Sequence, residues 1–112
     1  MMSDLSLMVG IDIGGTNLRL ALVGEDGSLV ERLKMPTGGD LTAFIAQLSN
    51  SVALLTEKAL DSGARVLGVG VGMPGLISPS GEIFSSVNLP YCEGVNLERE
   101  LQSLTGLPVA VV

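Results

Sequence analysis

Residues 9–19 have the sequence VGIDIGGTNLR, in which a double-glycine loop separates two apolar runs. The run ending at Ile13 and the run from Leu18 to Val23 have the length and composition of buried β-strands. Between them, residues 12–17 combine polar side chains with two glycines that can take a positive φ, which predicts a tight turn. The chain is therefore expected to open with an antiparallel hairpin.

The pattern downstream indicates an α/β sheet. Residues 29–35 form a third strand candidate, and a helical period of apolar residues then runs from Leu41 to Ala59. Asp40 is placed to cap the first amides of this helix, and Gly63 to end it in the left-handed conformation. The apolar residues 65–73 then predict a strand parallel to the first, because a helical crossover connects the two.

The last third of the chain predicts loops, a short helix and a final strand. A loop at residues 74–81 precedes a short extended segment at residues 83–84. Asn96 is expected to cap a helix that reaches Thr105. The apolar residues 109–112 should form a central strand, and since natural termini are usually polar, we expect these 112 residues to be part of a longer protein. The fold class is α/β, with three antiparallel strands followed by parallel strands and crossover helices.

Composition narrows the function classes. The net charge is −6, and the 6 basic residues are scattered singly, so no nucleic-acid surface is expected. The absence of histidine excludes Ser-His-Asp and Cys-His triads and histidine-ligated metal sites within the chain. Cys92 is the single cysteine and is interpreted as a structural thiol. With no signal peptide and no apolar membrane span, we expect a cytoplasmic protein with no membrane partner.

The double-glycine turn has the chemistry of a phosphate site. Successive amides of Gly14, Gly15 and Thr16 can converge on a phosphate without an obstructing side chain, and the threonine hydroxyl adds a donor. Asp12, at the end of the preceding strand, is a candidate ligand for Mg²⁺. The alternative is an ordinary hairpin whose glycines serve geometry alone.

A second glycine pattern, residues 70–75, matches the dinucleotide-binding spacing G-x-G-x-x-G. That fingerprint must lead into a helix, whereas here Pro74 and a loop follow. We interpret Gly68, Gly70 and Gly72 as small residues on one side of a strand that let a helix pack close. Pro74-Gly75 is expected to turn the chain over a pocket.

Asn88 is the candidate for sugar recognition. It precedes Leu89-Pro90, and an amide side chain both donates and accepts hydrogen bonds, which suits sugar hydroxyls. A loop-capping asparagine is the alternative.

Together these motifs resemble the ROK (repressor, ORF, kinase) family of sugar kinases. The resemblance rests on residues 9–19, on residues 68–77 with the sequence GVGVGMPGLI, and on Asn88-Leu89-Pro90, in that order. It implies a ribonuclease H-like, actin-like ATPase fold with two lobes, in which residues 1–112 are the N-terminal lobe, cut before its end. It also implies ATP- and Mg²⁺-dependent phosphorylation of a hexose such as glucose.

The resemblance also implies roles for individual residues. Those that approach the ATP phosphates are Gly14, Gly15, Thr16 and Asn17, with Asp12 at the metal and Gly75 and Asn88 on the sugar side. The catalytic aspartate is expected in an Asn-Asp pair just after Val112, so we expect no catalytic residue and no activity in these 112 residues alone. A structural zinc site in the C-terminal lobe and a homodimer are further expectations. Cys92 stands where such kinases usually carry tryptophan.

Two other functions stay open. A sugar-responsive ROK repressor needs a DNA-binding segment ahead of the hairpin, and only 9 residues precede Gly10. An actin-like ATPase that does not phosphorylate sugar would keep the hairpin but has no need of Asn88. The sequence does not choose among hexoses, or between ATP and polyphosphate as the donor.

Overall fold

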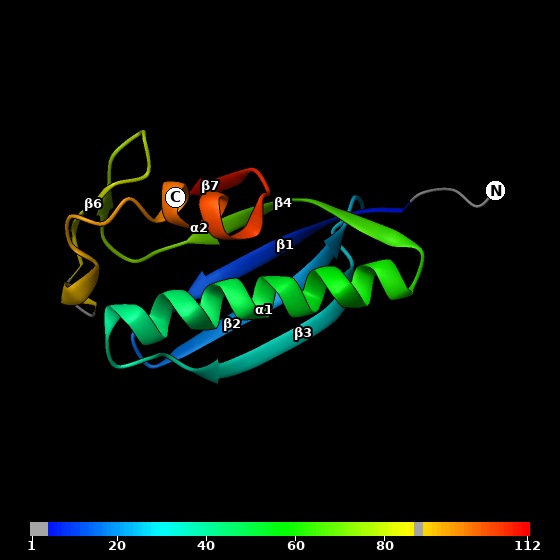
Figure 1. Cartoon of the computed structure of the whole chain (residues 1–112), viewed down its shortest axis with the longest axis horizontal. Helices are drawn as coiled ribbons and strands as arrows, with labels where there is room; N and C mark the ends of the chain where they lie inside the picture. The colour runs from blue at the N-terminus through cyan, green and yellow to red at the C-terminus, as the bar shows by residue number, and fades with distance from the viewer. Residues whose placement is uncertain (1–4, 87–88) are drawn as a thin grey trace.

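A computed structural model describes residues 5–86 and 89–112, so the Asn88 prediction lies outside the described residues. Its main element is a five-stranded sheet in the order β3-β2-β1-β4-β7 (Figure 1). The elements of this layer are β1 (Leu5–Ile13), β2 (Asn17–Gly24), β3 (Leu29–Pro36), α1 (Leu41–Asp61), β4 (Ala64–Gly72), α2 (Leu97–Thr105) and β7 (Val109–Val111).

The strand directions confirm the predicted fold class. The pairs β1–β2 and β2–β3 are antiparallel, whereas β1–β4 and β4–β7 are parallel. The parallel pairs are the ones joined by helices, as right-handed crossover connections require. One detail is wrong: within the described residues β7 pairs with β4 alone, so it is an outer strand and not the predicted central one.

Helix α1 forms where the periodicity predicts it. The Asp40 carboxylate accepts a hydrogen bond from the amide of Ala43 at 2.8 Å, which caps the first turn. Gly63, just beyond the helix, has φ +81°, the left-handed conformation that favours glycine. Both predicted ends of the helix are therefore confirmed.

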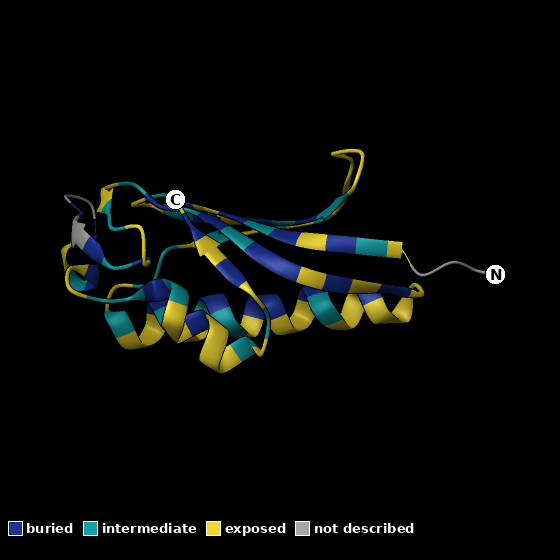
Figure 2. Cartoon of the chain, turned by 90° about the horizontal axis from the view of Figure 1, so that it is seen from above, coloured by how far each residue is buried: buried dark blue, intermediate teal, exposed yellow. Residues whose placement is uncertain are grey.

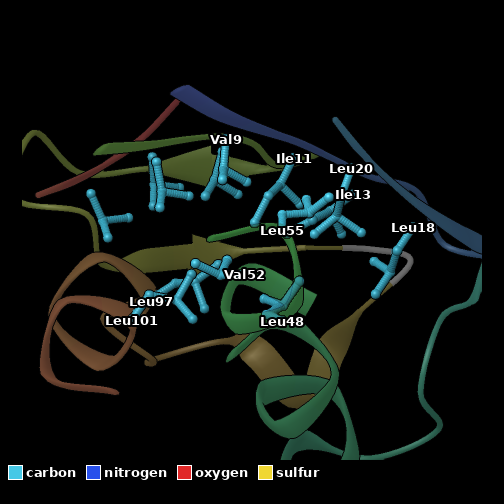
Figure 3. Close-up of a cluster of buried hydrophobic side chains, with 14 of the residues drawn as sticks. Val9, Ile11, Ile13, Leu18, Leu20, Leu48, Val52, Leu55, Leu97 and Leu101 are labelled. Carbon is cyan, nitrogen blue, oxygen red and sulfur yellow. The ribbon is translucent and has the colours of Figure 1, made fainter. Parts of the chain in front are cut away.

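The core lies on one face of the sheet. Both helices pack against that face, as Figure 2 shows from above. Alternate residues of the strands meet one stripe of α1 and one turn of α2 in a single apolar cluster (Figure 3). Its labelled members are Val9, Ile11, Ile13, Leu18, Leu20, Leu48, Val52, Leu55, Leu97 and Leu101, and all are buried. This packing fixes the position of the hairpin between β1 and β2.

The glycines of β4 face the side of the sheet away from α1 and α2, so neither described helix packs against them, contrary to the prediction. Their neighbours Val69 and Val71 are the residues that contribute to the core. A Cβ built on Gly70 would meet nothing within 4 Å. Gly70 instead lines an open groove of about 670 Å³ on the face away from α1 and α2. The inference failed because alternation shows that the glycines share a face but not which face is covered.

A small two-stranded sheet, β5 (Leu76–Ile77) and β6 (Ile83–Ser85), extends from the end of β4. The sequence predicted a loop over most of this region, and no helix follows the glycines of β4, so residues 70–75 do not have the context of a dinucleotide-binding fingerprint. A 3-10 turn, η1 (Pro90–Cys92), carries the cysteine. Burial raises the pKa of the Cys92 thiol to about 11, which keeps it protonated and supports a structural role.

Of the helices described, neither combines the length and apolar character needed to cross a bilayer. The cytoplasmic location stays a prediction.

Candidate phosphate-binding hairpin

The turn between β1 and β2 is closed by a hydrogen bond from the Gly14 amide to the Asn17 carbonyl oxygen at 2.9 Å. Neither Gly14 nor Gly15 has a positive φ, so the expected use of glycine for that conformation is wrong. The requirement at Gly14 is steric instead. A Cβ on Gly14 would lie 2.9 Å from the Asn17 carbonyl oxygen, closer than two such atoms approach.

The tip of the hairpin carries amides without a partner. Gly15 and Thr16 are exposed, and their N–H groups donate no hydrogen bond to any residue that the structure describes. Since backbone amides are strong donors, two of them at one turn form a ready site for an anion. The phosphates of a nucleotide fit this donor set.

Two carbonyl oxygens of the same turn accept hydrogen bonds from Thr37. The Thr37 hydroxyl donates to the Gly14 carbonyl oxygen at 2.8 Å, and the Thr37 amide donates to the Thr16 carbonyl oxygen at 2.9 Å. These two acceptors are thus turned toward the protein, whereas Gly15 and Thr16, which carry the two amides, are exposed. Sequence reasoning missed Thr37, because it lies 23 residues from Gly14 and no local pattern connects them.

Asp12 is the residue before the last in β1, next to the turn, and it is exposed. It pairs in register with Arg19 on β2 and with Gly72 on β4, and it lines the open groove together with Arg32 and Lys34. Among the described residues there is no group of three or more acidic, cysteine or histidine side chains able to hold a metal. One carboxylate still suits Mg²⁺, which keeps several waters and takes further oxygens from substrate phosphates.

Gly75, the sugar-side candidate that lies among the described residues, is at the same edge of the sheet as the hairpin. The parallel strands β1, β4 and β7 end there together, and the amide of Met73 donates to the Val112 carbonyl oxygen at 2.9 Å. Gly75 follows three residues after Gly72, the register partner of Asp12, and its φ of 135° favours glycine. In open α/β sheets, ligands bind outside the carboxyl ends of parallel strands.

Ser86 ties the loop at Gly75 to the segment that precedes Asn88. Its side chain is 1% exposed, and its hydroxyl donates to the Pro74 carbonyl oxygen at 3.1 Å. The Ser86 amide donates to the Glu93 carboxylate at 3.2 Å. A buried serine beside the asparagine carries no sequence signal of its own, so this connection was also missed.

The family model described as "ROK family" matches residues 8–112. The chain belongs to the ROK family. It is 31% identical to a glucokinase of Halalkalibacterium halodurans over 112 residues, which covers 92% of this chain and 32% of that protein. It is 28% identical to a xylose repressor of Caldicellulosiruptor bescii, covering 96% of this chain and 28% of the repressor.

Among solved structures, the ROK family glucokinase from Streptomyces griseus in complex with glucose and AMPPNP superposes with a TM-score of 0.82 at 26% identity. The match covers 94% of this chain and 32% of that one. The mixed sheet of this ROK chain therefore has the actin-like ATPase fold of ROK kinases. The chain spans about a third of the length of the curated relatives it matches.

Proposed function

We propose that the full-length protein transfers a phosphoryl group from ATP, with Mg²⁺, to a hydroxyl of a hexose such as glucose. One observation carries the proposal: the amides of Gly15 and Thr16, which have no partner among the described residues, lie at the sheet edge where Gly75 also lies. Kinship with sugar kinases makes a nucleotide and a hexose the ligands to consider at this edge.

In the proposed reaction the hairpin holds the donor. The amides of Gly15 and Thr16 bind phosphate oxygens, with Gly14 and Asn17 shaping the turn, and the Asp12 carboxylate orients hydrated Mg²⁺. Such binding neutralises and positions the phosphates, on which phosphoryl transfer mostly depends. Gly75 and Asn88 line the sugar side in this proposal.

The hydroxyl proton of the sugar needs an acceptor. The ROK resemblance predicts an aspartate directly after Val112, and the hydrogen bond between Met73 and Val112 holds the end of that segment beside the turn to Gly75. We propose that an aspartate at that position accepts this proton. A zinc site in the other lobe and a homodimer remain parts of the proposal that concern the full-length protein.

The test is ADP release by the full-length protein with Mg²⁺-ATP and a panel of hexoses. We expect hexose-dependent ADP release and a sugar phosphate product for at least one hexose. Absence of both, from a folded protein that contains the predicted aspartate, would contradict the proposal.

Asn88→Ala tests the sugar side. Because the asparagine amide is proposed to bind sugar hydroxyls, the sugar KM should rise about tenfold, in line with one lost hydrogen bond to a polar ligand, while the ATP KM stays within about twofold. An unchanged sugar KM would remove Asn88 from the site and favour an actin-like ATPase.

A sugar-responsive transcriptional repressor is the second candidate, because the xylose repressor of Caldicellulosiruptor bescii is also similar to this chain. Sequence-specific DNA binding that a sugar relieves, without ADP release, would favour it.

A further inference from the structure

We propose that the segment Pro36–Gly38, here called the strap, couples the phosphate hairpin to residues 89–92, here called the sugar loop because they follow Asn88 in the sequence. Thr37 is then a positioning residue for the donor phosphates. This inference rests on the proposed function. It assigns a role to residues that bind neither substrate and that lie between two loops far apart in sequence.

Thr37 orients the amide that the donor would use. The hydroxyl of Thr37 holds the Gly14 carbonyl, which belongs to the same peptide unit as the amide of Gly15. In a trans peptide the C=O and N–H bonds point in opposite directions, and the described chain contains no cis peptide. The bond from Thr37 therefore directs the Gly15 amide away from the strap, toward solvent.

The second bond of Thr37 fixes the turn two residues further on. Its amide donates to the Thr16 carbonyl oxygen, so the carbonyls of Gly14 and Thr16 are both held by one residue that directly follows β3. A turn that is preorganised loses little conformational entropy when a ligand binds. The hairpin amides should consequently bind phosphate more tightly with Thr37 than without it.

Helix α1 fixes the strap itself. The Gln47 side-chain amide donates to the Pro36 carbonyl oxygen at 2.7 Å, and its oxygen accepts from the Gly38 amide at 2.7 Å. These bonds flank Thr37 on both sides. A Cβ on Gly38 would lie 2.9 Å from the Gln47 side-chain oxygen and 3.0 Å from the Phe44 amide nitrogen, so the strap is seated closely on the helix.

Tyr91 connects the strap to the sugar loop. Its hydroxyl donates to the Gly38 carbonyl oxygen at 2.6 Å, across 53 residues of sequence, and its ring packs on Phe44 with centroids 5.7 Å apart. Burial raises the pKa of the Tyr91 phenol, so the hydroxyl stays a donor at neutral pH. Tyr91 lies in η1, which directly follows the segment with Asn88. Figure 1 shows the hairpin, the end of β3 and this turn gathered at one end of the molecule.

The strap thus forms one continuous path. It runs from the Gly14 carbonyl through Thr37 and Gly38 to the hydroxyl of Tyr91. A movement of the sugar loop on hexose binding would shift Gly38 through its hydrogen bond with Tyr91. The shift would reach the hairpin through the neighbouring residue, Thr37. The two ligands should then bind cooperatively, with a coupling that depends on the Tyr91 hydroxyl.

The test uses the full-length protein and isothermal titration with Mg²⁺-AMPPNP. Thr37→Val removes the hydroxyl at constant shape, and we expect the nucleotide Kd to rise about tenfold, which corresponds to about 1.4 kcal/mol. Thr37→Ser keeps a hydroxyl and should restore the Kd to within about twofold. Thr56→Val is the matched control, because the Thr56 hydroxyl also donates a part-buried bond to a backbone oxygen, that of Val52 at 2.7 Å, far from the hairpin.

Tyr91→Phe tests the coupling. It keeps the ring on Phe44 and removes only the hydroxyl. We expect glucose to tighten nucleotide binding several-fold in the unaltered protein, and this factor to fall to about one in the variant, while each ligand alone binds within about twofold of the original Kd.

Three results would overturn the inference. The first is an unchanged nucleotide Kd in Thr37→Val, the second is an equal effect in Thr37→Val and Thr56→Val, and the third is independent binding of nucleotide and glucose by the unaltered protein. If only the proposed function fails, the protein will bind nucleotide but phosphorylate no hexose. The nucleotide Kd of Thr37→Val then still decides the role of Thr37. A protein that binds no nucleotide would contradict both.

Discussion

Two tight turns connect the antiparallel strands β1, β2 and β3, and they are held closed in different ways. In the turn between β2 and β3, the Asp26 carboxylate accepts from the Ser28 amide at 3.0 Å, and the Gly27 amide donates to the Gly24 carbonyl oxygen at 3.0 Å. These contacts all lie within the turn. In the turn between β1 and β2, by contrast, the carbonyl oxygens of Gly14 and Thr16 accept hydrogen bonds from Thr37, which lies outside the turn.

The aspartates at the two turns, Asp26 and Asp12, also differ in how their carboxylates are used. Asp26 lies inside its turn and is used to hold it closed, whereas Asp12 precedes its turn and keeps an exposed carboxylate beside the open groove. The hairpin at Asp12 takes its support from Thr37 in another part of the chain. We infer that a turn closed by its own residues alone serves structure, and that a turn held in part by a residue from outside serves binding.

The largest effect should follow from paired glycine substitutions. Gly14→Ala places a Cβ against the Asn17 carbonyl oxygen, so the turn must open, and we expect Mg²⁺-AMPPNP affinity to fall at least tenfold, about 1.4 kcal/mol. Gly27→Ala strains a residue at φ +85°, costing about 1 kcal/mol of unfolding free energy without changing nucleotide affinity. Calorimetric titration and urea unfolding measure the two quantities. Equal nucleotide affinity in both variants would abolish the distinction between the turns.

A smaller effect should separate the two aspartates. Asp12→Asn removes the charge proposed to orient Mg²⁺, so the Kd for AMPPNP should rise about fivefold to tenfold with Mg²⁺ present and change little with EDTA. Asp26→Asn serves as the matched control at the other turn and should leave both values unchanged. A rise that is the same with and without Mg²⁺ would show that Asp12 acts on the nucleotide without the metal.

The smallest effect concerns pH. The hydrogen bonds from Ser28 lower the pKa of the Asp26 carboxyl below its usual 3.8. A lowered pKa in the folded state adds stability above the unfolded value, and this stability is lost as pH falls through the folded pKa. The Tm advantage over Asp26→Asn should therefore be present at neutral pH and disappear in strong acid. A constant Tm difference across that range would mean that the carboxylate charge does not support the turn.

The sequence alone predicted the elements that depend on local pattern. The period of α1, the cap at Asp40 and the glycine at Gly63 are properties of a few adjacent residues, and all three predictions are confirmed. The β1–β2 hairpin was also predicted, but the reason for Gly14 was not, because the close approach to Asn17 appears only once the turn is built.

Long-range features could not be predicted in the same way. The bonds from Thr37 to Gly14 and from Tyr91 to Gly38 join residues 23 and 53 positions apart. The face toward which Gly70 points depends on where α1 packs, which alternation along a strand does not specify. The sequence therefore identified the candidate ligand groups, and only the folded chain shows what holds them in position.

The proposed phosphate site depends most on the amides of Gly15 and Thr16, which NMR spectroscopy can observe directly. The measurement is a titration of the ¹⁵N-labelled full-length protein with Mg²⁺-AMPPNP. We predict that the largest amide shifts fall on Gly15 and Thr16, that their hydrogen exchange slows on binding, and that Gly27 and Ser28 in the other turn do not respond. Nucleotide binding that leaves Gly15 and Thr16 unchanged would contradict the assignment of this hairpin as the phosphate site.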